Sequence, residues 1–164
     1  MLFAELTEIL KQSVWGEALI TFAVAMLPVF ELRGAIPLGV SLGLHPWASM
    51  TVSVIGNMVP TPFIILFIRR FFRFLCRKSR KISGFVMKLE TRAEGKWERI
   101  RKYEFIGLIL LVAVPLPGTG AWTGSLIAAI ANLRMRRALP AILIGVLIAG
   151  FIVTGMTFGF IAIL

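Results

Sequence analysis

Residues 27–37 have the sequence LPVFELRGAIP, and residues 114–124 have the sequence VPLPGTGAWTG. Each stretch interrupts a longer apolar segment with prolines and glycines, and the two interruptions occupy corresponding places in the two halves of the chain. Interruptions paired in this way point to a transporter whose binding site lies near the bilayer midplane, between two structural repeats. The two stretches therefore predict a small membrane transporter.

The composition excludes an ordinary soluble domain. Hydrophobic residues make up 58% of the chain, and the mean hydropathy is +0.89. Two charge-free runs, residues 46–68 and 138–164, contain 23 and 27 residues. A helix of about 20 apolar residues crosses roughly 30 Å of hydrocarbon. We therefore predict an all-α integral membrane protein with a transmembrane helix over each run.

The net charge of +10 is concentrated in residues 69–102, which contain thirteen Lys or Arg and three Glu. A basic module that binds nucleic acid is one explanation of such a block. However, membrane spans flank it, and basic loops beside spans lie in the cytoplasm under the positive-inside rule. We therefore expect a cytoplasmic loop and no nucleic-acid partner. The chain has one cysteine, so it forms no intramolecular disulfide.

The apolar segments beside the two interruptions are too short to cross a membrane. Residues 18–30 would reach only about 20 Å as a helix, so residues 18–44 and 103–133 are predicted to be re-entrant hairpins. Three arginines follow the second hairpin, and a hairpin places them on the same side as the basic loop. The result is an inverted repeat of re-entrant hairpin plus transmembrane helix, offset by about 88 residues. A plain bundle of about four or five spans is the alternative.

We thus expect a single membrane domain of six segments. These are an interfacial helix (1–17), the first re-entrant hairpin (18–44), a transmembrane helix (46–68), a basic cytoplasmic loop with an amphipathic helix (69–102), the second re-entrant hairpin (103–133) and a second transmembrane helix (138–164).

Glu31 and Arg33 are the charged residues of the first interruption. Ionisable groups inside a membrane are costly and usually mark function. In an unwound stretch between Pro28 and Pro37, both side chains could point into one cavity. Arg33 could bind an anionic headgroup while Glu31 positions it or takes up a proton. Alternatively, Glu31 could bind a hydrophobic cation in competition with protons, or the two residues could form an ion pair that only holds the hairpin.

The second interruption carries no charge, but it offers hydroxyl groups and the free N–H groups of a half-helix that starts near Gly120. A helix N-terminus inside the membrane favours an anion. A lone cluster of prolines and glycines is also commonly just a kink. The candidate ligands there are Gly118, Thr119, Gly120, Thr123 and Ser125.

Asn57 is the polar candidate of the first transmembrane helix, where it could bond a hairpin carbonyl or a neighbouring helix. Pro60 and Pro62 predict a kink in that helix. In the last helix, a small-residue face predicts close packing at Gly145, Gly150, Gly155 and Gly159.

Nothing in the chain resembles a metal site, a nucleotide-binding loop or a nucleophile triad. There is no Asp and a single His, so we expect neither enzyme activity nor a cofactor.

The two interruptions together resemble the small multidrug export family of prokaryotic membrane proteins, a relative of the DedA superfamily. The second half is also similar to the DedA pattern at Pro117-Gly118 and at residues 132–137. The resemblance implies two re-entrant hairpins, inverted repeats and a role in moving lipids or small molecules across the plasma (inner) membrane. Thr119 and Trp122 depart from the DedA pattern, because an Arg is common there.

The first expectation is a translocase for an anionic lipid headgroup or another phosphate-bearing amphiphile. Arg33 and the half-helix at Gly120 would bind the anion, and Glu31 would couple protons. The alternatives are a proton-coupled exporter of hydrophobic cationic drugs, with Glu31 as the exchanging carboxylate, and a membrane scaffold that transports nothing. The expected partners are membrane lipids, protons and a second copy of the chain, because one copy offers few spans to enclose a path.

Overall fold

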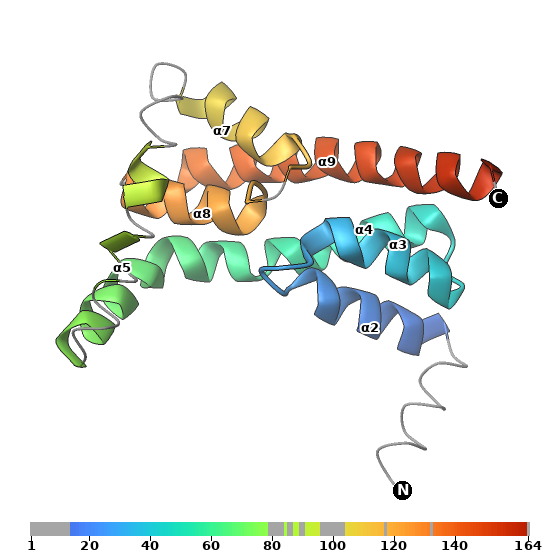
Figure 1. The fold of residues 1–164 in the computed structure, drawn as a ribbon, viewed down its shortest axis with the longest axis horizontal. Coiled ribbons are helices and arrows are strands. Elements are labelled where there is room, and N and C mark those ends of the chain that lie inside the picture. The colour runs from blue at the N-terminus through green and yellow to red at the C-terminus, as the bar shows by residue number, and fades with distance from the viewer. Residues whose placement is uncertain are drawn as a thin grey trace, which may run out of the picture. The chain divides into compact units, whose positions relative to one another are not determined.

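A computed structural model of the chain describes residues 14–78, 84, 87–88, 91–95, 104–116, 118–131 and 133–163 (Figure 1). These residues form helices and turns without any strand, so the all-α class is confirmed for them. The helices are α2 (Val14–Ala25), α3 (Glu31–Leu42), α4 (Pro46–Met58), α5 (Pro60–Lys78), α7 (Glu104–Ala113), α8 (Ala121–Ile130) and α9 (Met135–Ile163). The expected interfacial helix, except for its last residues, and most of the expected amphipathic loop helix lie outside the described residues.

The chain divides into two compact units. The first contains residues 1–59 and 146–164, and the second contains residues 60–145. The first unit therefore holds α2, α3, α4 and the C-terminal part of α9, and the second holds α5, α7, α8 and the N-terminal part of α9. Each unit contains one helical hairpin and the beginning of the long helical segment that follows that hairpin in the sequence. It also contains the end of the other long segment, where the two long segments are α4–α5 and α9.

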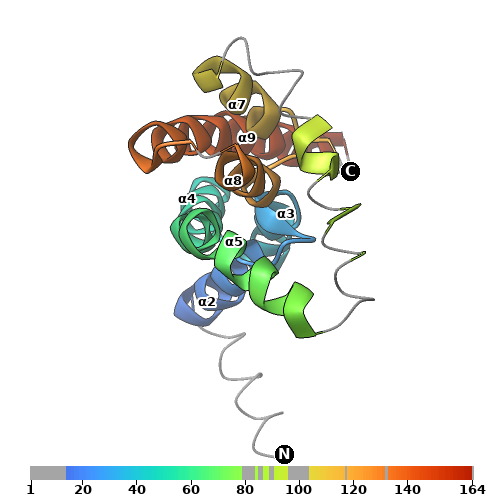
Figure 2. The same ribbon diagram turned by 90° about the vertical axis from the view of Figure 1, so that its left-hand side faces the viewer.

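In the first unit, α2, α3 and α4 pack against one another in pairs (Figure 2). Gly39 of α3 lies where the three helices meet. A Cβ at Gly39 would lie 2.7 Å from Oγ1 of Thr21 in α2 and would also strike the hydroxyl of Ser49 in α4. The absence of a side chain at this position lets the three backbones approach closely.

In the second unit, α8 packs against both α5 and α7 (Figure 2). Gly124 of α8 faces α7 and α9, because a Cβ there would lie 2.6 Å from Val112 and 3.6 Å from Ile142. In this hairpin, as in the first one, a glycine of the second arm lets the neighbouring helices pack closely.

The two hairpins contact the long helices that follow them in matching ways. A Cβ on Gly56 of α4 would lie 2.6 Å from the carbonyl oxygen of Phe22 in α2. A Cβ on Gly145 of α9 would lie 2.9 Å from the carbonyl oxygen of Ile109 in α7 and 2.6 Å from the Cβ of Val112. In each unit, a glycine of the long helix rests on the backbone of the first arm of the preceding hairpin.

The predicted glycine face of the last helix covers only part of its length. Gly150 packs closely on α4, since a Cβ there would lie 3.1 Å from Cε of Met50. No described atom comes within 4 Å of a Cβ built on Gly155 or Gly159. The prediction is confirmed for Gly145 and Gly150, and within the described chain it is wrong for the last two glycines.

Helix α9 turns an apolar face outward. The exposed side chains along it are Leu143, Ile144, Leu147, Ile148, Phe151, Ile152 and Met156. By contrast, several polar side chains are buried among the described residues, namely Thr21, Glu31, Ser49, Ser53, Asn57, Thr61, Ser125 and Thr154. Apolar groups outside and polar groups inside suit a protein surrounded by lipid rather than by water.

Two helical segments, Pro46–Ile68 and Met135–Gly159, are long and apolar enough to cross a membrane. The first corresponds to α4 and the start of α5, which are separated at Val59 just before Pro60. Val59 itself keeps a helical backbone, and its N–H donates to the carbonyl oxygen of Ile55, so the kink expected at Pro60 and Pro62 stays a prediction.

Two helix boundaries differ from the predicted ones. Helix α5 continues to Lys78, so residues 69–78 are helix rather than loop, and α9 begins at Met135 rather than at residue 138. Arginine and lysine are good helix formers. The charged residues that end each apolar run therefore do not end the helix.

Candidate functional site

The turn between α2 and α3 places Glu31 at the start of a helix. Helix α2 ends at Ala25, and the chain turns before the N–H of Glu31 donates a hydrogen bond of 3.0 Å to the carbonyl oxygen of Leu27. Glu31 has φ +48°, which makes it the only non-glycine residue with positive φ among those described. This conformation costs about 1–2 kcal/mol for a residue with a side chain, and strain of this kind concentrates at functional sites.

The Glu31 carboxylate is buried near a guanidinium. Its residue is only 5% exposed, and Arg33, two positions further on, is half-buried. The two charges attract each other. A buried carboxylate needs such compensation, because removing a charge from water costs several kcal/mol when nothing neutralises it.

The predicted unwound stretch between Pro28 and Pro37 is wrong at its second end. Helix α3 begins at Glu31 and runs through Pro37, so both charged residues lie in its first turn. The proline removes one helical hydrogen bond. Beside it, the Ser49 hydroxyl of α4 donates a hydrogen bond of 2.9 Å to the carbonyl oxygen of Ile36. This bond holds α3 against α4 one residue before the proline.

The second interruption is a true break between helices. Gly118 has φ +77° and Gly120 has φ +122°, values that residues with side chains rarely adopt. Gly120 is the N-cap of α8, which begins at Ala121. The predicted half-helix start near Gly120 is confirmed.

Two of the three candidate hydroxyls in this region are bonded to the main chain. Oγ1 of Thr119 lies 2.7 Å from the carbonyl oxygens of both Val114 and Leu116, which ties the loop together. The buried Ser125 hydroxyl donates a hydrogen bond of 2.6 Å to the carbonyl oxygen of Ala121. These contacts give Thr119 and Ser125 a structural role. The side chain of Thr123 is half-buried in the first turn of α8.

The predicted site residues fall into two groups. Glu31, Arg33 and Asn57 belong to the first unit, where Asn57 is fully buried in α4. The candidates from Gly118 to Ser125 belong to the second unit. Both charged candidates therefore lie in the first hairpin, and Asn57 lies in the helix that follows it.

Besides the predicted Asn57, helix α4 carries two buried serines that the sequence analysis did not select. Ser49, Ser53 and Asn57 are all fully buried, and we call them the α4 polar stripe. Their spacing of four residues puts them on one face of the helix. The Ser53 hydroxyl, like that of Thr154 in α9, has no hydrogen-bond partner among the described residues. The spacing of the two serines and Asn57 in an apolar helix was the available signal.

No group of three or more potential metal ligands lies together in the described part of the chain.

Comparison with known proteins identifies the family. The model of a family described as "Putative small multi-drug export protein" matches residues 31–152, which is 122 of the 164 residues. The match begins at Glu31, the first residue of α3, and includes the second helix break and all the candidate site residues. No curated protein and no solved structure matches the chain. The match confirms the expected resemblance, whereas the relation to the DedA superfamily stays a prediction. The chain belongs to the family of small multidrug export proteins.

Proposed function

We propose that this protein is a membrane transporter that exports hydrophobic cations, and that the Glu31 carboxylate binds them. The observation that carries the proposal is a buried carboxylate at a strained helix start inside an apolar domain. Burying a carboxylate in that position costs free energy, and a role in binding a cation explains why one is present there. Membership of a multidrug export family points to the same class of substrate.

The lengths of the hairpin arms support re-entrant hairpins. Helices α2 and α3 have 12 residues each, and α7 and α8 have 10 each. At about 1.5 Å per residue they reach roughly 15–18 Å, about half of the hydrocarbon thickness. An arm of that length can enter the membrane and return, but it cannot cross.

The matching glycine contacts support the inverted repeat. Gly56 and Gly145 are 89 positions apart in the sequence, and the carbonyl groups they approach, on Phe22 and Ile109, are 87 apart. Both offsets agree with the repeat of about 88 residues expected from the sequence. In the proposed topology, the basic segment and the arginines at the start of α9 face the cytoplasm of a prokaryotic cell.

The pairing of Glu31 with Arg33 suggests how the substrate is exchanged. With no substrate bound, Arg33 compensates the carboxylate. A hydrophobic cation or a proton takes over that role when it arrives, and one carboxylate cannot hold both. Apolar side chains next to Glu31 suit the body of such a cation, because the turn exposes Leu27, Val29 and Phe30.

Two observations favour export over the lipid translocase that the sequence first suggested. The family description names drug export, and the expected anion ligands Thr119 and Ser125 donate to backbone carbonyl groups. The scaffold alternative is weaker, because a scaffold has no need of a strained, buried carboxylate.

Ligand-dependent thermal stability of the purified protein tests this proposal. A ligand that binds only the folded state raises the melting temperature. We expect tetraphenylphosphonium to stabilise the wild type, less so at low pH because protons compete for Glu31. Glu31→Gln should abolish the effect. Glu94→Gln, at an exposed residue outside the hairpins, is the matched control and should behave as wild type.

Two outcomes would contradict cation export. Stabilisation by polyprenyl phosphate or phosphatidic acid that disappears in Arg33→Ala but survives in Glu31→Gln would support the lipid translocase. Equal stabilisation by tetraphenylphosphonium in the wild type and in Glu31→Gln would show that Glu31 does not bind the cation.

A further inference from the structure

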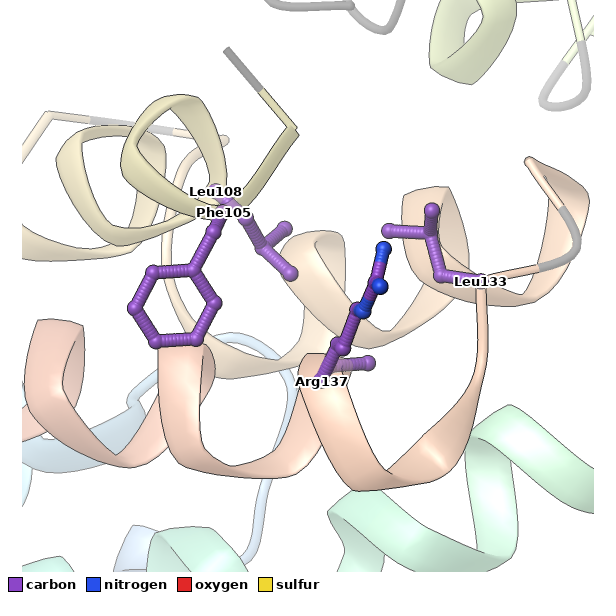
Figure 3. Close-up of a pocket in the computed structure, with 5 residues that line it drawn as sticks. Phe105, Leu108, Leu133 and Arg137 are labelled. Atoms are coloured by element: carbon purple, nitrogen blue, oxygen red, sulfur yellow. The ribbon is translucent and has the colours of Figure 1, made fainter.

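A cavity of about 240 Å³ lies within the second unit, at the open end of the second hairpin. Its lining comes from α7, from the segment after α8 and from the start of α9, and consists of Phe105, Leu108, Leu133, Arg137 and Ala138 (Figure 3). A single water needs only about 10–15 Å³. The cavity is therefore large enough for part of an organic molecule.

The lining combines apolar walls with one cation. Figure 3 shows the guanidinium of Arg137 beside Leu133, with Phe105 and Leu108 across the cavity. Arg134 and Arg136, next to it in the sequence, are also exposed. Positive charge at the rim and apolar carbon within fit a molecule that is anionic at one end and apolar at the other.

The position of the cavity along the chain fits a lipid headgroup. The second candidate span begins at Met135, two residues before Arg137. The cavity is thus level with the start of a membrane span, where phosphates meet hydrocarbon. This step rests on the membrane placement proposed above, but not on cation export.

We propose that this cavity binds one anionic phospholipid. The guanidinium of Arg137 holds the phosphate through charge-assisted hydrogen bonds. Phe105, Leu108 and Leu133 contact the glycerol and the first methylene groups of the chains. An inorganic anion would gain nothing from these walls, and a zwitterionic lipid would be attracted less by the three arginines. The bound lipid links α7 to α9 at the base of the hairpin.

Lipid binding to the delipidated full-length protein in neutral detergent tests the proposal, with native mass spectrometry counting bound lipids. We expect one phosphatidylglycerol to bind in preference to phosphatidylcholine, and inorganic phosphate not to compete. Arg137→Gln should weaken phosphatidylglycerol binding about tenfold, as loss of a charged hydrogen bond does. Arg136→Gln, which removes the same charge outside the lining, is the matched control and should retain most of the affinity.

A second variant separates the cavity from the surface charge. Leu133→Trp keeps all three arginines but fills the space, and it should also prevent binding of the lipid. Equal losses in Arg136→Gln and Arg137→Gln, or undiminished binding in Leu133→Trp, would overturn the proposal. Competition by inorganic phosphate would do so as well. Glu31→Gln should retain the lipid site, so a failure of the export proposal is distinguishable from a failure here.

Discussion

At the scale of single residues, Glu31 combines two unfavourable properties. Its backbone has φ +48° and its carboxylate is buried. Glycine would remove the backbone strain, and a polar residue at the surface would avoid the burial. A strained and buried glutamate is the observation from which its proposed role in cation binding is argued.

We therefore predict an unusual order of stability for two substitutions at this position. Both Glu31→Gly and Glu31→Ala remove the carboxylate, but only glycine adopts a positive φ without strain. Glu31→Gly should be the more stable by about 1 kcal/mol, as measured by thermal melting in detergent. Ser41, exposed on the same helix, provides the control. There, Ser41→Ala should be more stable than Ser41→Gly by about 1 kcal/mol, because alanine is the better helix former. The same order at both positions would contradict the strained turn.

Sequence analysis found the charged residues of the site more readily than the uncharged ones. Glu31 and Arg33 stand out because charge is rare in apolar segments. Ser49 and Ser53 do not, because a serine can bond its own helix and needs no partner elsewhere. Only the packing of α2, α3 and α4 shows that these serines are buried beside Asn57.

At the scale of helices, Gly56 and Gly145 support corresponding contacts. A methyl group at either position would press on the backbone of a hairpin arm, at 2.6 Å from the Phe22 carbonyl oxygen and at 2.9 Å from that of Ile109. Backbone cannot move aside as a flexible side chain can.

We predict that Gly56→Ala and Gly145→Ala each lower the free energy of unfolding by about 1–3 kcal/mol. Gly155→Ala is the control in the same kind of helix, since no described atom lies within 4 Å of its Cβ. It should be neutral or stabilise by up to about 1 kcal/mol. Melting temperatures of the three variants provide the comparison. If Gly56→Ala lowered the melting temperature and Gly145→Ala did not, the equivalence of the two hairpins would be contradicted.

The sequence located both helix breaks but not their extent. Proline and glycine show where a helix is weakened, and neighbouring elements decide whether it stops. At Pro37 the helix continues, with Ser49 bonded to the carbonyl beside it. At Gly118 and Gly120 the backbone has positive φ, and the helix ends. The difference depends on tertiary contacts, which a linear pattern does not contain.

At the scale of the whole molecule, the proposed re-entrant topology predicts which positions share one side of the membrane. In a background of Cys76→Ser, single cysteines replace His45, Glu94 and Arg134. The cysteines at 94 and 134 should react with a membrane-impermeant maleimide in inverted vesicles, and the one at 45 in spheroplasts. A single crossing of residues 105–133 would instead place positions 94 and 134 on opposite sides.

The outward apolar face of α9 has a practical consequence for determining how many copies assemble. In the purified protein we expect detergent to cover that face, so the 18.1 kDa chain should migrate in gel filtration as a larger particle of protein and detergent. The hydrodynamic radius of this particle therefore includes the bound detergent as well as the protein. The expected homodimer is accessible only to methods that weigh polypeptide separately, such as light scattering combined with ultraviolet absorbance and refractive index.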